Sequence, residues 1–407
     1  MSVEVHIEWE GTTHFVGRIH TTQRSPAVSF EYAPEWLGRE GAFAIDPTAL
    51  PLRPGAHHSG ALFGAMQDCG SDRWGRTLIE RAVRKHVLDR KPYQDLDCVL
   101  ALGDVSRVGA LRFHGDRDSP FLAVARGNIP PVMQLGALLN AANAVHGKTE
   151  TAKDLRYLFG QGSPLSGARP KSAIALPDGR LAIAKFPKPD DTRDIAAGEV
   201  LALTLAHHAG IQVAGHRPVE VKGKIVSVIT RFDRDGVRRI PFLSANSLLG
   251  LPPGEPGAYT MLADGIRQFG HDTTSDLREL WRRLIFSLLV SNCDDHLRNH
   301  GFLMRAPGRW TLSSAYDVNP VPEIERTQMP KTPISEYQEE PTIAAALAAA
   351  PRFGLKAAEA ETILREVLAA VSDWRKTGRQ LRLKASTLDA YGTAFEHPLV
   401  EEARHLS

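Results

Sequence analysis

Cysteine, long apolar runs and an excess of charge of one sign are all lacking in this sequence. Its 407 residues include three cysteines, Cys69, Cys98 and Cys293, too few for an even-numbered disulfide set and without the spacing of metal ligands. A reducing setting is therefore favoured. The uninterrupted apolar runs are far shorter than the about 20 residues that cross a bilayer. The N-terminus shows no basic and apolar segments of a secretory signal. We expect a cytoplasmic protein with no membrane segment.

The remaining composition is that of an ordinary globular protein. Hydrophobic residues make up 43% and charged residues 24% of the chain, and the formal net charge is +2. Such a small net charge gives no argument for nucleic-acid binding. The sixteen histidines are scattered, which predicts mainly surface or structural roles. The length predicts two or three folded units with a sizeable core.

A crowded polar stretch follows the apolar, helix-like run 280–290. Within it, Asp294 stands five positions before Asn299, the spacing of the proton-accepting Asp and the metal-binding Asn in protein-kinase catalytic loops. Asp295 stands only four positions before Asn299 and does not fit this spacing. Further on, Asp317 could complete a Mg²⁺ site, as a kinase Asp does after the catalytic loop. The alternative is a polar loop that only caps a buried helix.

Features of a nucleotide site lie upstream. The loop 160–171 contains three glycines, two serines and two cations, and small residues allow a backbone to approach phosphates closely. Strands are predicted at 172–176 and 181–186. Lys185 lies on the second strand between apolar neighbours and needs an anionic partner, which in kinases is the α- and β-phosphates and a helix Glu. By itself a Gly-rich loop is more often a turn.

The helix predicted at 192–209 supplies a candidate for that Glu. Glu199 is the acid in its middle, among Ala, Val and Leu. A Glu that faces solvent is the alternative. A hairpin then runs through 219–232, where strand-like sequence gives way to helical sequence. A kinase hinge would lie at this point, with the backbone near Thr230 and Phe232 facing an adenine.

These patterns predict an α+β, protein-kinase-like fold of two lobes, with an additional N-terminal β-rich subdomain and an all-helical C-lobe. Alternating residues predict strands at 3–9, 12–20 and 27–32. The predicted divisions are an N-terminal subdomain (1–115), a helical connector (116–150), a kinase N-lobe (151–235) and a helical C-lobe (236–407).

Four further motifs occur along the chain, namely Ser166-Gly-Ala-Arg-Pro-Lys171, Arg231-Phe-Asp-Arg234, Asn292-Cys-Asp-Asp-His-Leu-Arg-Asn299 and Ser314-Ala-Tyr-Asp317. In sequence and order they resemble the motifs of HipA-type toxins, the serine/threonine kinases of bacterial toxin–antitoxin modules. The N-terminal half also resembles this family, through Phe30-Glu-Tyr-Ala, Trp74-Gly-Arg and Val108-Gly-Ala-Leu-Arg-Phe. The resemblance therefore covers nearly the whole chain.

The resemblance implies ATP and Mg²⁺ as cofactors and a role for each matching residue. Asp294, with His296 close by, resembles the catalytic residues, and Asn299 and Asp317 resemble the Mg²⁺ ligands. The implied ATP-binding residues are Lys185, Thr230, Phe232, Ser166, Gly167, Ala168, Lys171 and Glu199. Further implications are a small helix-turn-helix antitoxin, operator DNA bound through that antitoxin, and a protein substrate such as an aminoacyl-tRNA synthetase.

The sequence departs from the family pattern in the Gly-rich loop. Family members autophosphorylate a serine there, but the best-known position is Pro164 in this chain. Ser163 and Ser166 flank it and are the candidates. Arg169 replaces the common Gln, and Arg298 replaces the usual Lys. Two other functions stay open, namely a small-molecule phosphotransferase of the same fold and a non-catalytic pseudokinase that assists an antitoxin as co-repressor.

Overall fold

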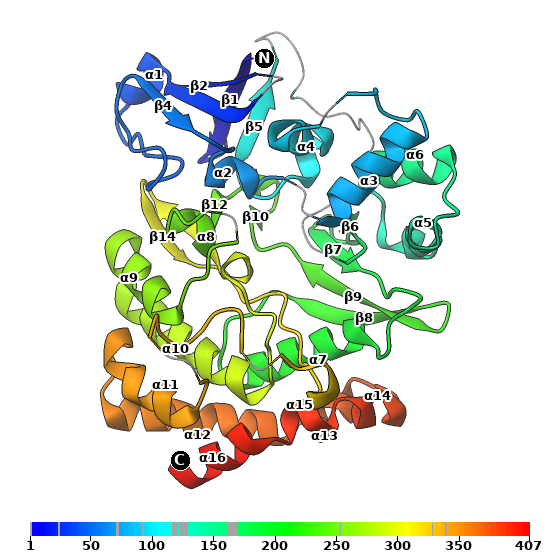
Figure 1. The fold of residues 1–407 in the computed structure, drawn as a ribbon, viewed down its shortest axis with the longest axis vertical. Coiled ribbons are helices and arrows are strands. Elements are labelled where there is room, and N and C mark those ends of the chain that lie inside the picture. Colours follow the sequence, from blue (N-terminus) through cyan, green and yellow to red (C-terminus); the bar gives the residue numbers. More distant parts are fainter. Residues whose placement is uncertain are drawn as a thin grey trace. The chain divides into compact units, whose positions relative to one another are not determined.

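The chain divides into two compact units in its computed structural model (Figure 1). Unit 1 comprises Met1–Asp190 and Val219–Leu243, and unit 2 comprises Asp191–Pro218 and Ser244–Ser407. The described residues are 2–22, 25–70, 73–91, 93–115, 121, 129–161, 169–252, 254–327, 329–337 and 340–407. The domain boundaries at 115, 150 and 235 were predicted from changes in sequence composition, and they stay predictions.

Unit 1 opens with a five-stranded antiparallel sheet in the order β4-β3-β2-β1-β5. Its strands are β1 (Ser2–Trp9), β2 (Thr12–Thr22), β3 (Ser25–Tyr32), β4 (Ala56–Ser59) and β5 (Leu111–His114). Val3, Val5 and Ile7 alternate along β1 and are buried. Glu10 and Gly11 join β1 to β2 with φ values of 52° and 78°, as a two-residue hairpin turn requires. The predicted N-terminal β structure is confirmed.

A second sheet, in the order β6-β7-β9-β8, belongs to unit 1 except for residues 216–218 at the start of β8, and it packs against helices in one hydrophobic core. Its strands are β6 (Lys171–Ala175), β7 (Leu181–Lys185), β8 (His216–Val221) and β9 (Lys224–Thr230). The helices before it are α1 (Pro34–Leu37), α2 (Gly64–Gln67), α3 (Arg73–Arg84), α4 (Asp95–Ala101), α5 (Leu135–His146) and α6 (Ala152–Gln161). Leu78 of α3, Leu138 of α5 and Leu155 of α6 join Ile174 and Val226 of the sheet in this core. The amphipathic helices thus cover the sheet that carries the predicted nucleotide residues.

Unit 2 is mainly helical. Its helices are α7 (Ile195–His208), α8 (Ala245–Leu248), α9 (Tyr259–Phe269), α10 (Thr273–Leu289), α11 (Ile343–Ala349), α12 (Ala357–Ser372), α13 (Trp374–Gln380), α14 (Ala385–Ala390), α15 (Gly392–Phe395) and α16 (Pro398–Leu406). The apolar face of α10 is buried through Trp281, Leu284 and Ile285, and α10 packs on α9 and α12.

One hairpin corrects the prediction of an all-helical C-lobe. Strands β13 (Gly301–Ala306) and β14 (Arg309–Leu312) pair antiparallel directly after the polar stretch that follows α10. Alternating apolar residues, with Phe302, Met304, Trp310 and Leu312 buried, explain why this segment forms strands. The α+β kinase-like fold class itself is confirmed.

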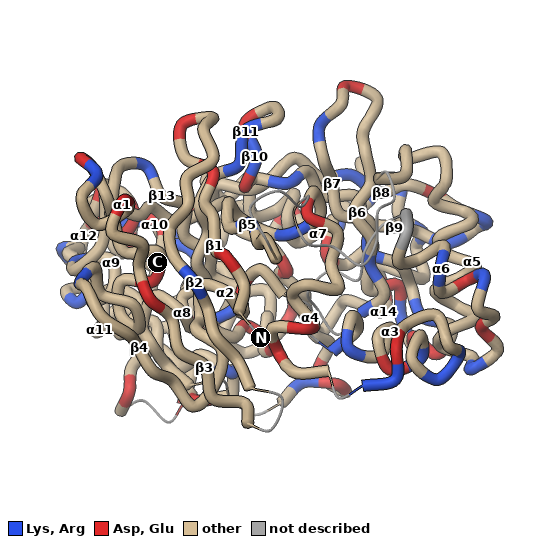
Figure 2. Tube along the Cα trace, turned by 90° about the horizontal axis from the view of Figure 1, so that it is seen from above, with Lys and Arg blue, Asp and Glu red and all other residues tan. Residues whose placement is uncertain are grey.

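Charges of both signs are distributed over the chain (Figure 2), in keeping with a net charge of +2. Basic residues of α3 are partly paired with acids, since Arg76 lies 2.8 Å from Asp95 and Arg81 lies 3.6 Å from Glu150. Among the described residues, the helices are too short or too polar for any of them to cross a membrane.

Candidate active site

The polar loop of unit 2 begins where α10 ends. Val290 is the C-cap residue of α10. Ser291 then has a positive φ of 53°, which turns the chain away from the helix axis. The amide of Asn292 still donates to the carbonyl of Ser287 at 2.9 Å. The loop closes in a short 3₁₀ turn at Leu297–Asn299 and enters β13. A buried helix and a buried strand therefore hold both ends of the loop.

The two adjacent aspartates of the loop have opposite environments. The side chain of Asp294 is 60% exposed and forms an ion pair with Lys331. Asp295 is buried, accepts a hydrogen bond from Tyr259 and lies 3.1 Å from Nε2 of His300. Burial alone would raise the pKa of Asp295, but His300 and Tyr259 hold it below its ordinary value. The carboxylate of Asp294 is thus accessible to a substrate, whereas the buried carboxylate of Asp295 stabilises the loop through its contacts with Tyr259 and His300.

The chain returns to this loop after the β13–β14 hairpin. The amide of Ser313 donates to Gly301 at 2.8 Å, and Tyr316 Oη donates to the carbonyl of Arg298 at 2.7 Å. The amide of Asn319 donates to Oδ1 of Asn292 at 3.1 Å. Residues 313–319, which contain Asp317, therefore lie along the loop that carries Asp294 and Asn299.

A small cavity lies between these two segments. Its volume is about 20 Å³, room for about one water molecule. Asn292 and Asn299 line it from the loop, and Tyr316 and Val318 line it from the returning segment. The two segments are therefore closely packed.

Asn299 and Asp317 offer oxygen ligands of the kind that Mg²⁺ prefers. Nδ2 of Asn299 donates to the carbonyl of Asp294 at 3.3 Å, which leaves its Oδ1 to act as an acceptor or ligand. Asp317 has a φ of 57°, a strained backbone region that is common at functional sites, and its Oδ1 accepts from Nδ2 of Asn319 at 3.2 Å. The described ranges contain no group of three His, Cys, Asp or Glu side chains able to hold a metal by themselves. The residues fit a magnesium ion that is also bound by phosphates.

Lys331 comes from a later segment that contacts the same loop. The amide of Lys331 donates to the carbonyl of Cys293 at 3.1 Å, and the amide of Tyr259 donates to the carbonyl of Pro333 at 3.0 Å. Sequence reasoning missed Lys331 and its pairing with Asp294. No spacing signal could have found Lys331, because its contact depends on the return of a distant loop.

Unit 1 brings two buried lysines together. Lys171 begins β6, Lys185 ends β7, and the strand register makes them direct cross-strand partners. Both are less than a tenth exposed. As direct cross-strand partners they leave the sheet on the same face, which places two positive charges close together. The sequence predicted both lysines as ATP-binding residues but did not predict that they oppose each other.

The end of β9 presents backbone groups in two directions. Ala182 pairs with Thr230 in the β7–β9 register, and the amide of Arg231 donates to the carbonyl of Leu181 at 2.9 Å. Because antiparallel partners alternate between bonded and non-bonded pairs, the backbone groups of Thr230 and Phe232 face away from β7. Their contact with an adenine stays a prediction.

The remaining candidate residues divide into three groups. Glu199 is buried in α7, so the alternative that it faces solvent is wrong. Its predicted pairing with Lys185 would join the two units and stays a prediction. The Nδ1 atom of His296 is buried and has no hydrogen-bond partner within the described part of the chain. Ser163, Ser166, Gly167 and Ala168 lie outside the described residues.

A fold of this kind, with a lysine-bearing sheet in one unit and an Asp-Asn-Asp constellation in a mainly helical unit, defines the protein-kinase-like class. The model of the HipA-like C-terminal domain matches residues 163–374, and that of the HipA N-terminal domain matches residues 9–114. The chain therefore belongs to the HipA family.

Two known proteins with related sequences also have kinase names. A Haemophilus influenzae protein is 26% identical over 204 residues, which are 44% of this chain and 60% of that protein. Kinase Y4mE of Sinorhizobium fredii is 27% identical over 352 residues, 78% of this chain and 77% of the relative. Both relatives carry the word kinase in their names. The match to the first relative covers 60% of that protein, which is less than two thirds of its length.

A solved structure shows the same fold. It is described as the Shewanella oneidensis toxin–antitoxin system HipA, HipB and its operator DNA complex, and it is 15% identical with a TM-score of 0.71. The match covers 99% of this chain and 97% of that one.

Proposed function

We propose that this protein is a cytoplasmic, Mg²⁺- and ATP-dependent serine/threonine protein kinase that acts as the toxin of a toxin–antitoxin module. The observation that supports the proposal most is the packing of residues 313–319 along the loop 291–299. This packing brings an exposed Asp294, Asn299 and Asp317 onto adjoining segments of unit 2.

Each residue has a role in this proposal. Asp294 orients the substrate hydroxyl and accepts its proton, and its exposure leaves it accessible to a protein substrate. Asn299 and Asp317 would hold the magnesium ion, which, when bound, neutralises charge on the phosphates. His296 lies in the same loop, and its buried Nδ1 could donate to a phosphate oxygen.

Unit 1 supplies the nucleotide-binding residues. Lys185 and Lys171 would hold the phosphates, because the β6–β7 register places these two buried cations beside each other on one face of the sheet. The backbone of Thr230 and Phe232 would hold the adenine, and Glu199 would pair with Lys185. The loop residues Ser166, Gly167 and Ala168 would cover the phosphates, with Ser163 or Ser166 as the site of autophosphorylation.

Transfer of the labelled γ-phosphate of ATP to protein tests the catalytic assignment. Asp294→Asn should lower the rate by roughly 10²- to 10⁴-fold, the usual contribution of a positioned acid–base group. Asp317→Ala should also lower it strongly, because a proposed magnesium ligand is lost. The matched control is Asp389→Asn, an exposed acid of unit 2 that also pairs with a cation, Arg375 at 3.3 Å. Full activity of either active-site variant would refute the assigned roles.

The same assay separates the other candidate functions. Label on small metabolites of a lysate instead of on protein bands would identify a small-molecule phosphotransferase. Nucleotide binding without any transfer would identify a pseudokinase. Mass spectrometry of residues 160–172 after incubation with ATP tests autophosphorylation, which would add about −1.5 to −2 charges near Arg169 and Lys171.

The partners proposed for this chain are a small helix-turn-helix antitoxin and, through it, operator DNA. Support comes from the fold that it shares with a HipA found in a complex with HipB and operator DNA. The proposed substrate is an aminoacyl-tRNA synthetase. Phosphorylation of purified synthetases, one at a time, would identify the target, and the absence of label on all of them would exclude this substrate class.

A further inference from the structure

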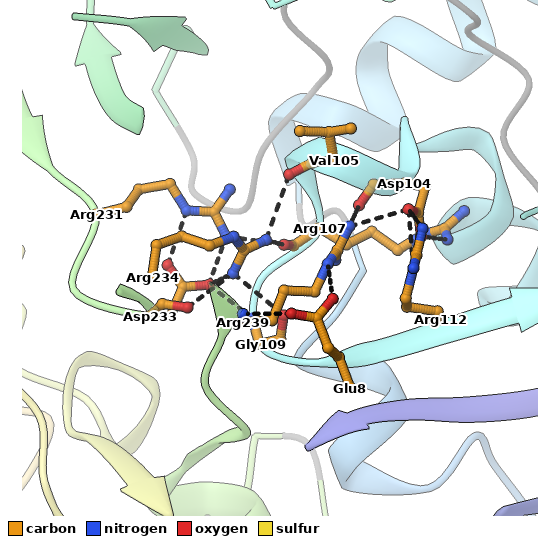
Figure 3. A network of polar contacts seen from close by, with 10 residues as sticks. All are labelled: Glu8, Asp104, Val105, Arg107, Gly109, Arg112, Arg231, Asp233, Arg234 and Arg239. Atoms are coloured by element: carbon orange, nitrogen blue, oxygen red, sulfur yellow. Dashed lines mark hydrogen bonds and ion pairs between the residues drawn. The ribbon is translucent and has the colours of Figure 1, made fainter. Parts of the chain in front are cut away.

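A buried cluster of charged residues surrounds the segment that directly follows β9 (Figure 3). Its members come from two parts of unit 1 that are more than 90 residues apart in the sequence. They are Glu8, Asp104, Arg107 and Arg112 from the N-terminal region, and Arg231, Asp233, Arg234 and Arg239 from the segment after β9. We call this group the charge cluster. It joins the N-terminal region to the end of the strand that carries Thr230.

Arg231 binds the N-terminal region with both ends of its guanidinium group. Nη1 donates to the carbonyl of Ser106 at 2.7 Å, and Nη2 donates to the carbonyl of Arg107 at 2.8 Å. Its Nε donates to Oδ1 of Asp233 at 2.8 Å. The planar group is thus used in three directions, which a lysine could not reproduce.

Asp233 binds the same N-terminal segment from the other side of Phe232. Its Oδ2 accepts from the amide of Gly109 at 2.7 Å and from Nη1 of Arg234 at 2.6 Å. Gly109 has a φ of +75°, and a Cβ there would lie 3.2 Å from Phe242, so this close approach requires glycine. Residues 231 and 233 therefore fix the backbone on both sides of Phe232.

The charge balance of the cluster makes Asp233 important. Five arginines face three acids, and carbonyl oxygens of residues 99–109 accept much of the surplus of N–H donors. Asp233 is buried, which by itself would raise its pKa, but Arg231 and Arg234 hold the pKa well below its ordinary value. Burial lowers the pKa of Arg234 to about 9. The loss of the Asp233 charge would leave neighbouring buried guanidinium groups to repel each other.

The anchored backbone is the one proposed to bind adenine. Thr230 and Phe232 direct their backbone groups away from β7, and their positions depend on what holds residues 231 and 233. We propose that Asp233, together with Arg231, is a positioning residue for nucleotide binding, through which the N-terminal region sets the geometry of the adenine-contacting backbone. This inference rests on the kinase function proposed above.

The test compares Asp233→Asn with the control Asp235→Asn in the full-length protein. Asp233→Asn keeps the shape and an acceptor for Gly109 but removes the charge. Asp235 lies two residues further on, and its ion pair with Arg238 at 3.3 Å is exposed, so the same substitution there leaves the cluster intact. A second variant, Arg231→Lys, keeps the charge and removes the planar group. It tests the same positioning role if Asp233→Asn does not fold.

The measurements are the Kd of a fluorescent ATP analogue, and KM for ATP and kcat for phosphate transfer, at a temperature where circular dichroism shows each variant folded. We expect Asp233→Asn and Arg231→Lys to raise Kd and KM for ATP at least tenfold while kcat changes less than threefold. Asp235→Asn should match the wild type. A lower melting temperature with an unchanged Kd would overturn the inference, because the cluster would then only support the fold. Absence of nucleotide binding by the wild type would overturn the proposed function as well, which distinguishes the two failures.

Discussion

The adjacent residues Asp294 and Asp295 should give opposite results when each is replaced by alanine. Asp294→Ala should abolish phosphate transfer and leave the stability of unit 2 nearly unchanged. Asp295→Ala should destabilise unit 2 strongly. The reason is that Asp294 is exposed and paired with exposed Lys331, whereas Asp295 is buried against Tyr259 and His300.

The magnitudes follow from these environments. An exposed ion pair contributes about 0–1 kcal/mol. Removal of one partner from a buried charged pair costs about 3–5 kcal/mol, since the remaining polar groups are left buried and unsatisfied. In a unit of roughly 190 residues, 1 kcal/mol shifts Tm by about 2–4 °C. We expect a decrease of about 6–20 °C for Asp295→Ala and at most about 4 °C for Asp294→Ala.

The pH dependence provides an independent check. The pKa of Asp295 is lowered in the folded protein, so its stabilisation is present above the unfolded pKa of about 4 and is lost as pH falls through the folded value. Asp295→Ala should therefore be less sensitive to acid than the wild type below pH about 4. Differential scanning calorimetry at pH 7.5 and pH 3.5 measures both effects. Equal Tm values for Asp295→Ala and Asp294→Ala at pH 7.5 would refute the division of roles.

Three further predictions concern packing, protonation and the metal. A Cβ on Gly198 would lie 2.2 Å from Oη of buried Tyr391, so Gly198→Ala should cost about 1–3 kcal/mol and lower Tm, whereas Gly392→Ala, which meets only the end of the Arg375 side chain, should not. Burial lowers the pKa of His397 to about 4. Because the unfolded state binds the proton first, stability should fall by about 3 kcal/mol as pH drops from 6.5 to 4, and calorimetry of His397→Gln should show this part of the pH dependence removed. Removal of divalent ions with EDTA should stop phosphate transfer and Mg²⁺ should restore it; continued transfer without metal would contradict the roles of Asn299 and Asp317.

Local patterns of this sequence were sufficient for most of the secondary structure. The predicted helix at 192–209 corresponds to α7, and Gly210 follows it with a φ of +77° as a C-terminal capping residue should. The apolar, helix-like run 280–290 likewise corresponds to the second half of α10. These features depend on neighbours in the chain, which a sequence shows directly.

Long-range contacts could not be predicted in the same way. The five-residue spacing singled out Asp294 but gave no role to Asp295, whose partner Tyr259 is 36 residues away. The motif Arg231-Phe-Asp-Arg234 was noted only as a family resemblance, because its acceptors Ser106 and Gly109 are more than 120 residues distant. The opposition of Lys171 and Lys185 depends on the register of the β6–β7 hairpin, in which Ala175 pairs with Leu181, and the predicted strand limits did not fix that register.

The contacts of Arg231 and Asp233 limit how this protein can be shortened. A truncated protein that begins at residue 151 would retain both side chains and lose the carbonyl and amide groups of residues 106–109 that they bind. The truncation would uncover apolar Phe242, which lies 3.2 Å from the Cβ position of Gly109, and would remove the fixed acceptors of the guanidinium groups. Attempts to isolate the kinase-like part alone should therefore yield aggregated material, and the role of the N-terminal region is better studied with point substitutions in the intact chain.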